Sequence, residues 1–193
     1  MPKSKHTRKN KRRDRSGPPP KRRNSALAGI QLRAFEIKDE IDETYQPSIP
    51  DEIADATIKL RDGQIEEAKA AFERIIEREP RAREAYLNLA VAYALQGDEI
   101  TAETLTRQLL DKFPDYAMPR LNLAKLHLHR GQIEEAEKML LPLDHVRKFT
   151  SIEFQNYTLT WHDILTAEGN YAAAQSWKNM LLDVMSKSPG MFR

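Results

Sequence analysis

One six-residue string occurs twice in this chain and constrains its fold more than any other feature. Gly-Gln-Ile-Glu-Glu-Ala runs from Gly63 to Ala68 and again from Gly131 to Ala136. Midway between the two copies, Gly97–Ala102 keeps the same first and last residues around a different interior. The glycine and the alanine therefore both recur with a period of 34, as 97 − 63 and 131 − 97. A fixed period of this size predicts a solenoid, in which similar units stack and share a continuous core.

Each period contains two helical patterns that meet at the glycine. In the second period we predict helices over 83–95 and 98–112. Gly97 would supply the positive φ that ends the first helix, and Asp98 can cap the second. Pro114 closes the unit, as Pro80 closes the one before it. The array is predicted to span 49–186 as four units, 49–82, 83–116, 117–150 and 151–186.

Small residues recur with the same period and indicate how the helices pack. Ala56, Ala90 and Ala124 follow one another at this period of 34. Small side chains that face each other let two helices approach closely, while bulky neighbours fill the flanks. We therefore predict that Ala90 and Ala124 are buried where paired helices touch.

Together, these columns resemble the tetratricopeptide repeat. The matching residues of the second period are Tyr86, Leu89, Ala90, Tyr93, Ala102, Thr106 and Pro114. The resemblance extends over about 140 residues. It implies an all-α fold, a right-handed superhelical solenoid of about four helix pairs. It also implies that the first helices of the pairs line a concave groove. An N-terminal helix and a disordered basic tail are predicted to precede this array.

Departures from the repeat pattern predict local differences between the units. Asp55 stands where leucine is usual and Lys59 where tyrosine is usual, so the first unit is interpreted as an atypical terminal repeat. Pro142 is expected to cut short the second helix of the third unit. The step from Gly131 to Gly169 is 169 − 131 = 38 instead of 34, so the first helix of the fourth unit is predicted to be about one turn longer.

Residues 25–48 precede the array and carry an amphipathic pattern. Ser25 can cap a helix, and Pro47 can end it. The apolar stripe consists of Leu27, Ile30, Ala34, Ile37, Ile41 and Tyr45. We predict a connector helix that covers the first end of the array, because a repeat array exposes an apolar face at each end. The alternative is a dimerising or partner-binding helix. Residues 187–193 are predicted to be a C-terminal tail.

The charge of the chain is divided unequally. Residues 1–24 contain eleven Lys and Arg and one acid, a charge of +10, so the remainder carries 2 − 10 = −8. This basic arm has almost no large apolar side chain, and we predict that it is disordered. We predict that it binds RNA, DNA or another polyanion through Lys9, Lys11, Arg12, Arg13, Arg15, Lys21, Arg22 and Arg23. The alternatives are an anionic membrane surface, a solubilising tail, or a tail that folds onto its own acidic body.

A column of asparagines lies opposite the core stripe of the first helices. Asn88, Asn122 and Asn156 recur with the period of 34. The resemblance implies that such asparagines bind the backbone of a protein ligand, since an amide offers both a donor and an acceptor. Alternatively they are solvated, or they bridge to a neighbouring helix. The predicted groove residues are Asn88, Val91, Leu95, Met118, Asn122, Lys125, His129 and Asn156, and Lys125 is expected to favour an acidic residue of the ligand.

The sequence contains no recognisable catalytic or metal-binding motif. His127 and His129 are two apart on a helix and point to different sides, so they cannot share a metal. There is no cysteine, no serine in a glycine elbow and no phosphate loop. We predict a non-enzymatic protein-binding scaffold without cofactor or metal, and the alternative is a pure protein adaptor or assembly factor. Its oligomeric state is left open.

The sequence also allows a prediction of the cellular location of the protein. The apolar runs are shorter than the roughly 20 residues of a membrane-spanning helix. The charged N-terminus is not followed by an apolar core, so it does not resemble a secretory signal. We expect a cytoplasmic protein, or a nuclear one if the source is a nucleated cell.

Overall fold

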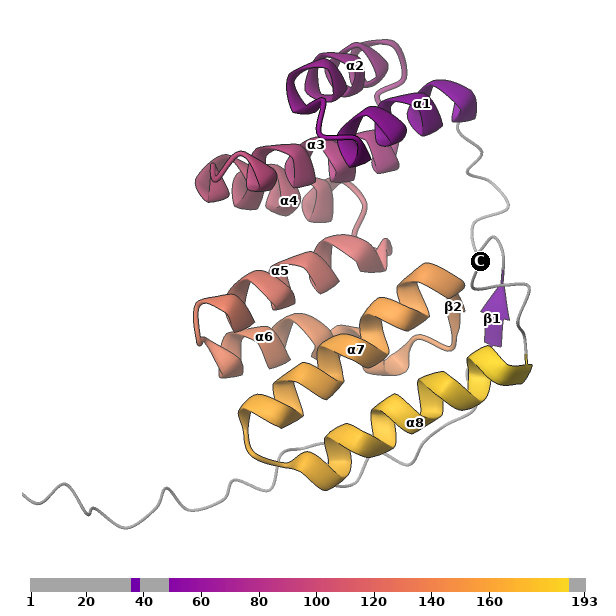
Figure 1. Ribbon diagram of the computed structural model, residues 1–193, viewed down its shortest axis with the longest axis vertical. Coiled ribbons are helices and arrows are strands. Elements are labelled where there is room, and N and C mark those ends of the chain that lie inside the picture. Colours follow the sequence, from indigo (N-terminus) through magenta and orange to yellow (C-terminus); the bar gives the residue numbers. More distant parts are fainter. Residues whose placement is uncertain (1–35, 39–48, 188–193) are drawn as a thin grey trace, which may run out of the picture. The chain divides into compact units, whose positions relative to one another are not determined.

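The computed structural model describes residues 36–38 and 49–187 (Figure 1). The basic arm and residues 188–193 lie outside these ranges. The elements are strand β1 (Glu36–Lys38), helices α1 (Pro50–Arg61), α2 (Ile65–Arg78), α3 (Arg83–Leu95), α4 (Glu99–Lys112), α5 (Ala117–His129) and α6 (Ile133–Leu140), 3-10 helix η2 (Leu141–His145), strand β2 (Lys148–Thr150), and helices α7 (Ser151–Ala167) and α8 (Tyr171–Lys187).

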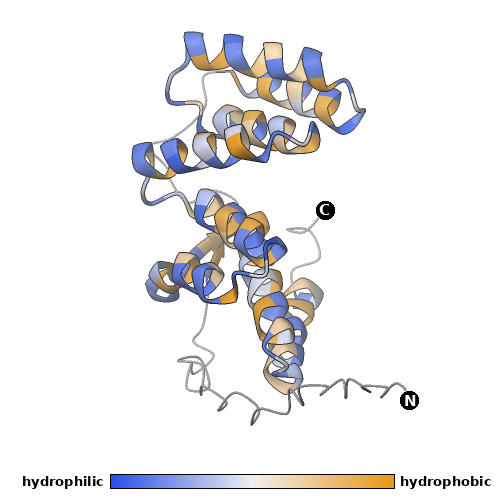
Figure 2. Cartoon of the chain, turned by 90° about the vertical axis from the view of Figure 1, so that its left-hand side faces the viewer, coloured by the Kyte–Doolittle hydropathy of each residue, from blue (hydrophilic) through white to orange (hydrophobic). Residues whose placement is uncertain are grey.

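The helices form antiparallel pairs that stack in chain order. α1 packs on α2, α3 on α4, α5 on α6 and α7 on α8, and each pair also contacts the next through α2 with α3, α4 with α5 and α6 with α7. Each helix carries both hydrophobic and hydrophilic residues, as an amphipathic packing face requires (Figure 2). The predicted all-α repeat solenoid is therefore confirmed. In the described ranges, no helix is both long and apolar enough to cross a bilayer.

A glycine with positive φ joins the two helices of each pair. Gly97, for example, has φ of 82° between α3 and α4. A Cβ at this position would meet nothing within 4 Å, so the backbone conformation, not a lack of space, demands glycine here. Immediately after it, the carboxylate of Asp98 accepts a hydrogen bond of 3.0 Å from the N–H of Thr101 and caps α4. The predicted helix stop and cap are both present.

The alanine columns lie in the core. The exposed fraction is 3% for Ala90 and 0% for Ala124, and Ala56 is equally buried on α1. The partner column on the second helices, Ala68, Ala102 and Ala136, is buried as well. The prediction that small residues mark the helix contacts is confirmed.

The third and fourth pairs differ from the others as the sequence indicates. α6 ends at Leu140, and Pro142 lies in the 3-10 helix that replaces its last turns. α7 has 17 residues, four more than α3 or α5, which is about one turn. The fourth pair has an aromatic core in which the rings of Phe149 and Tyr157 stack at 5.2 Å between centroids and those of Trp161 and Trp177 stack at 6.0 Å.

The predicted connector helix is wrong where the structure describes it. Within 25–48, residues 36–38 form strand β1, which pairs in parallel with β2 in the register Glu36↔Lys148, Ile37↔Phe149 and Lys38↔Thr150. The β-branched Ile37 suits a strand, and pairing with a partner far along the chain overrides the local helical pattern. This strand also lies at the junction of the third and fourth pairs, not at the first pair as expected. The rest of 25–48 lies outside the described residues.

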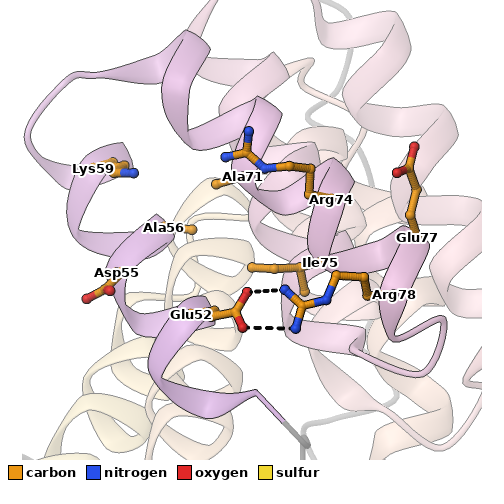
Figure 3. Close-up of a pocket in the computed structure, with 9 residues that line it drawn as sticks. All are labelled: Glu52, Asp55, Ala56, Lys59, Ala71, Arg74, Ile75, Glu77 and Arg78. Atoms are coloured by element: carbon orange, nitrogen blue, oxygen red, sulfur yellow. Dashed lines mark hydrogen bonds and ion pairs between the residues drawn. The ribbon is translucent and has the colours of Figure 1, made fainter.

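The atypical residues of the first unit lie on the outer face of the first helix pair. Asp55 and Lys59 occupy the columns of Leu89 and Tyr93, which in α3 lie against α2 of the preceding pair. Within the described ranges no helix precedes α1, and Asp55 and Lys59 line a cleft of about 420 Å³ on this end (Figure 3). Charged side chains therefore stand where an inner repeat needs apolar ones, as in a terminal repeat.

A bidentate ion pair lies across the same cleft. The guanidinium of Arg78 on α2 donates to both carboxylate oxygens of Glu52 on α1, at 2.7 and 3.1 Å (Figure 3). Both side chains are about half exposed, so we expect the pair to contribute at most about 1 kcal/mol to stability. This end of the array is a solvated face.

Replacing Ala124 by leucine tests the register of the helix contacts. Ala124 is fully buried between paired helices, so extra methylene groups would force the helices apart. We expect Ala124→Leu to lower the free energy of unfolding by about 1–3 kcal/mol in urea denaturation. Ala70→Leu, at an exposed position of α2, is the matched control and should change it by less than about 0.5 kcal/mol. Equal stability of the two variants would show that the contact is misassigned.

Candidate binding groove

The first helices of the pairs carry the asparagine column on the face opposite the core. Asn88, Asn122 and Asn156 take equivalent positions on α3, α5 and α7, and all three are half-buried. Partial burial of an amide calls for hydrogen-bond partners, either within the chain or from a ligand. The partners of the three side chains differ.

Two of the three asparagines tie neighbouring repeats together. The Asn88 amide donates to the Thr57 hydroxyl on α1, at 3.0 Å. That hydroxyl in turn donates to the carbonyl of Ile53, at 2.7 Å, so it is fixed in orientation. On the last repeat, the Lys125 ammonium on α5 donates to the Asn156 carbonyl oxygen. Both pairs have the same sequence separation of 31, so they represent one repeated contact, and these asparagines act as the bridges that the sequence left as an alternative.

Asn122 interrupts this ladder. The residue at the equivalent separation before it, 122 − 31 = 91, is Val91, whose side chain has no hydrogen-bonding group. Among the described residues the amide of Asn122 has no hydrogen-bond partner of its own. The central member of the column therefore has its whole amide available to a ligand, whereas Asn88 and Asn156 each already use part of theirs within the chain.

Lys125 lies in the groove beside Asn156. Desolvation lowers the pKa of its ammonium group, and the negative charge of Asp163 on α7 acts in the opposite direction. Lys125 therefore already has a polar and an acidic neighbour within the chain. Its expected preference for an acidic ligand residue stays a prediction.

A cavity of about 800 Å³ lies beside the asparagine column, with Asn88 in its lining. The N-terminal ends of α3, α5 and α7 surround it together with β2. Its apolar lining comes from Leu87, Tyr116, Met118, Val146, Phe149 and Ile152. Of the predicted groove residues, Asn88 and Met118 line this cavity, whereas Val91, Leu95, Asn122, Lys125, His129 and Asn156 lie along the first helices outside it.

The polar groups of the cavity are held in fixed positions. The Arg83 guanidinium lies 4.8 Å above the ring of Tyr116, and its Nε donates to the Glu84 carboxylate at 3.2 Å. On the opposite wall, the carboxylate of Glu153 accepts from the N–H and the hydroxyl of Thr150, both at 3.0 Å. The Thr150 hydroxyl accepts from the Glu153 N–H at 3.2 Å, which completes a capping box for α7. This wall is rigid.

Two models of the tetratricopeptide repeat family match adjoining parts of the sequence, one over residues 54–99 and the other over 95–152. The chain belongs to the tetratricopeptide repeat family. A similar solved structure is the crystal structure of a tetratricopeptide repeat protein from Parabacteroides merdae, with 17% identity and a TM-score of 0.48. That similarity covers 75% of this chain and 56% of the other, so this chain matches little more than half of that protein. None of the curated proteins matches the sequence.

One wall of the cavity in this tetratricopeptide repeat protein was not predicted. The truncated helix at Pro142 was expected, but strand β2, which follows it, was not predicted. The capping-box pattern Thr150-x-x-Glu153 was the available signal for the start of α7. Strand β2 itself had no signal beyond the β-branched and aromatic residues of a very short run.

Over 36–38 and 49–187 no group of three or more His, Asp or Glu side chains is placed to hold a metal ion. His127 is buried, and its Nδ1 lies 2.8 Å from the amide oxygen of Gln132, which follows the turn after α5. His127 lies one period after Tyr93, as 127 − 93 = 34, and this hydrogen-bond contact is within the repeat itself.

The ladder predicts different stabilities for two asparagine variants. Asn88→Ala removes the hydrogen bond to Thr57 and should lower the free energy of unfolding by about 0.5–1.5 kcal/mol. Asn122→Ala removes no hydrogen bond within the described residues and should change it by less than about 0.5 kcal/mol. Urea denaturation of both variants measures the difference. A larger loss for Asn122→Ala than for Asn88→Ala would contradict this assignment of the column.

Proposed function

We propose that this chain is a non-enzymatic scaffold whose groove binds a segment of another protein, while its basic arm contacts RNA, DNA or another polyanion. The scaffold would act in the cytoplasm, or in the nucleus if the source cell has one. Membership of the tetratricopeptide repeat family supports a role in protein binding in general. The observation that carries the proposal for the groove is the available amide of Asn122.

An amide in this position suits the backbone of an extended segment. Its N–H₂ can donate to a backbone carbonyl while its oxygen accepts from a backbone N–H. Val91 on α3 lies one repeat earlier and is half-buried, and Leu95, at the end of the same helix, is 60% exposed. Apolar side chains of the ligand would lose contact with water against these two residues.

The cavity beside the asparagine column supplies an anchoring position. Its volume of about 800 Å³ falls within the range of pockets that enclose small ligands or large side chains. Because apolar residues such as Met118 and Leu87 line it, we propose that an apolar or aromatic residue of the bound segment enters it. Backbone recognition at Asn122 and side-chain anchoring here would then act together.

The polyanion half of the proposal rests on the charge of the arm. The charge of +10 carried by residues 1–24 releases condensed counterions when it binds a phosphate backbone. The arm has no aromatic residue that could stack on bases, so we propose affinity without base specificity. The arm lies outside the described residues, and this half is argued from the sequence alone.

Peptide binding by matched variants tests the groove. Peptides are first selected from a random display library on the intact chain, and their Kd values are then measured for Asn122→Ala and Asn179→Ala. Asn122→Ala should weaken binding by on the order of 1 kcal/mol, roughly fivefold in Kd. Asn179, an exposed asparagine on α8, should be replaceable without effect. Equal binding by the wild type and Asn122→Ala would exclude this face as the binding site.

Nucleic-acid binding at several salt concentrations tests the arm. The intact chain should bind a DNA duplex with an affinity that falls steeply with salt, because each neutralised phosphate contributes about −0.9 to the slope of log K against log salt. Deletion of residues 1–24 should abolish binding. A full-length variant with the eight predicted polyanion-binding residues replaced by glutamine should also fail to bind, which separates charge from chain length. Absence of binding by the intact chain would instead favour the pure adaptor.

A further inference from the structure

Glu153 is a buried carboxylate in the lining of the cavity that β2 and the N-terminal ends of α3, α5 and α7 surround. Only 6% of the residue is exposed. A buried charge is costly unless its oxygen atoms have hydrogen-bond partners. The partners of the two carboxylate oxygens therefore indicate what this part of the cavity can bind.

Thr150 occupies only one of the two carboxylate oxygens of Glu153. The backbone N–H and the hydroxyl of Thr150 both donate to Oε2, at 3.0 Å. The other oxygen, Oε1, accepts no hydrogen bond from the described residues. Among those residues, the one fully buried side-chain nitrogen or oxygen without a partner is Nε1 of Trp161, so Oε1 keeps some accessible surface. Because Glu153 lines the cavity, Oε1 is an acceptor that a group inside the cavity can reach.

The surrounding contacts hold this acceptor in place. The Glu153 N–H donates to the Thr150 hydroxyl at 3.2 Å, so the capping box fixes both side chains at the start of α7. Next to them, Phe149 is fully buried and its ring stacks on that of Tyr157. An acceptor that is already fixed loses little conformational entropy when a ligand binds.

The rest of the lining favours an aromatic group with a neutral donor. Apolar residues such as Leu87 and Met118 would remove an aromatic ring from water. A charged ligand group would lose its hydration in the cavity, and the lining has a net charge of only 2 − 3 = −1 to offset that loss. The hydroxyl of a phenol or the N–H of an indole is a neutral donor on an apolar ring. The charged lining residues are Arg83, Lys148, Glu84, Asp115 and Glu153.

We propose that this cavity binds aromatic groups that carry a hydrogen-bond donor, and that Oε1 of Glu153 accepts from that donor. For a bound protein segment, the anchoring residue is then tyrosine or tryptophan, not phenylalanine or leucine. The identity of the anchoring residue rests on the proposed function, whereas the binding of small aromatic donors does not. A purely apolar group would displace water from Oε1 without replacing its hydrogen bond, which weakens binding.

Binding of two small aromatic compounds to the intact chain tests the acceptor. p-Cresol carries a hydroxyl donor, and 4-methylanisole is the same ring with that hydroxyl methylated. Titrations followed by amide NMR should give a Kd at least about tenfold lower for p-cresol, because a hydrogen bond to a charged acceptor is stronger than one between neutral groups. Equal Kd values for the two compounds, or no binding of p-cresol, would overturn the inference.

Three variants locate the acceptor. Glu153→Gln keeps an oxygen for the capping box, where glutamine also serves, but places an NH₂ donor where the free acceptor was. Its Kd for p-cresol should rise at least about tenfold, with unchanged 4-methylanisole binding and helical circular dichroism. Asp115→Asn, in the same lining, and Glu67→Gln, exposed on α2, remove the same charge and should leave p-cresol binding unchanged. No loss for Glu153→Gln, or an equal loss for Asp115→Asn, would refute the assignment.

A peptide exchange separates this inference from the proposed function. In the peptides selected on the intact chain, the tyrosine or tryptophan is replaced by phenylalanine. The exchange should weaken binding to the wild type at least about tenfold and leave binding to Glu153→Gln nearly unchanged. Equal weakening for both proteins, or selected peptides without tyrosine and tryptophan, would overturn the assigned anchor. Failure to select any peptide would count against the proposed groove, while the p-cresol titration would still test the cavity.

Discussion

The packing of each first helix against the second helix of the preceding pair governs the rest of this structure. Leu89 of α3 belongs to the same buried cluster as Phe72 and Ile75 of α2, and the ammonium of Lys69 lies 4.2 Å above the ring of Tyr93. This contact fixes the period, since every unit must present the same face to its predecessor. It also determines the first unit, where Asp55 occupies the column of Leu89 without a described predecessor. Apolar residues there would expose a surface prone to association.

The position of the asparagine column is a consequence of the same contact. Once one face of a first helix packs on its predecessor, residues about half a turn away are left on the opposite face, and the asparagines lie there. Neighbouring first helices are then close enough for Asn88 to reach Thr57 and for Lys125 to reach Asn156. The asparagine column thus stabilises the stacking at two junctions. Where valine replaces the hydrogen-bonding partner, the amide of Asn122 makes no such bridge.

Local and periodic features of the fold were predictable, and long-range pairings were not. The glycine at position 97, the cap at Asp98 and the shortened helix before Pro142 each depend on a few neighbouring residues, and the repeat period supplies that information several times over. Strand β1 depends on a partner in the second half of the chain, where Glu36 pairs with Lys148, and its apolar spacing also fits a helix. The cavity wall formed by β2 could not be assigned to the groove for the same reason. Asn122 and Asn88 occupy equivalent positions in the repeat, so the sequence pattern alone could not distinguish them. They differ in whether the preceding first helix offers a hydrogen-bond partner.

The hydrogen bonds within the column affect how much each asparagine can contribute to binding. A ligand that competes for the Asn88 N–H bonded to Thr57, or for the site on the Asn156 oxygen bonded to Lys125, replaces an intramolecular hydrogen bond worth roughly 0.5–1.5 kcal/mol, about as much as the new bond contributes. The net gain from these two groups is therefore close to zero. At Asn122 the only bonds exchanged are with water, so the net contribution of a new bond is retained. Binding energy should consequently concentrate at the centre of the array, between Val91 and Lys125, where an apolar and a charged neighbour flank the same amide.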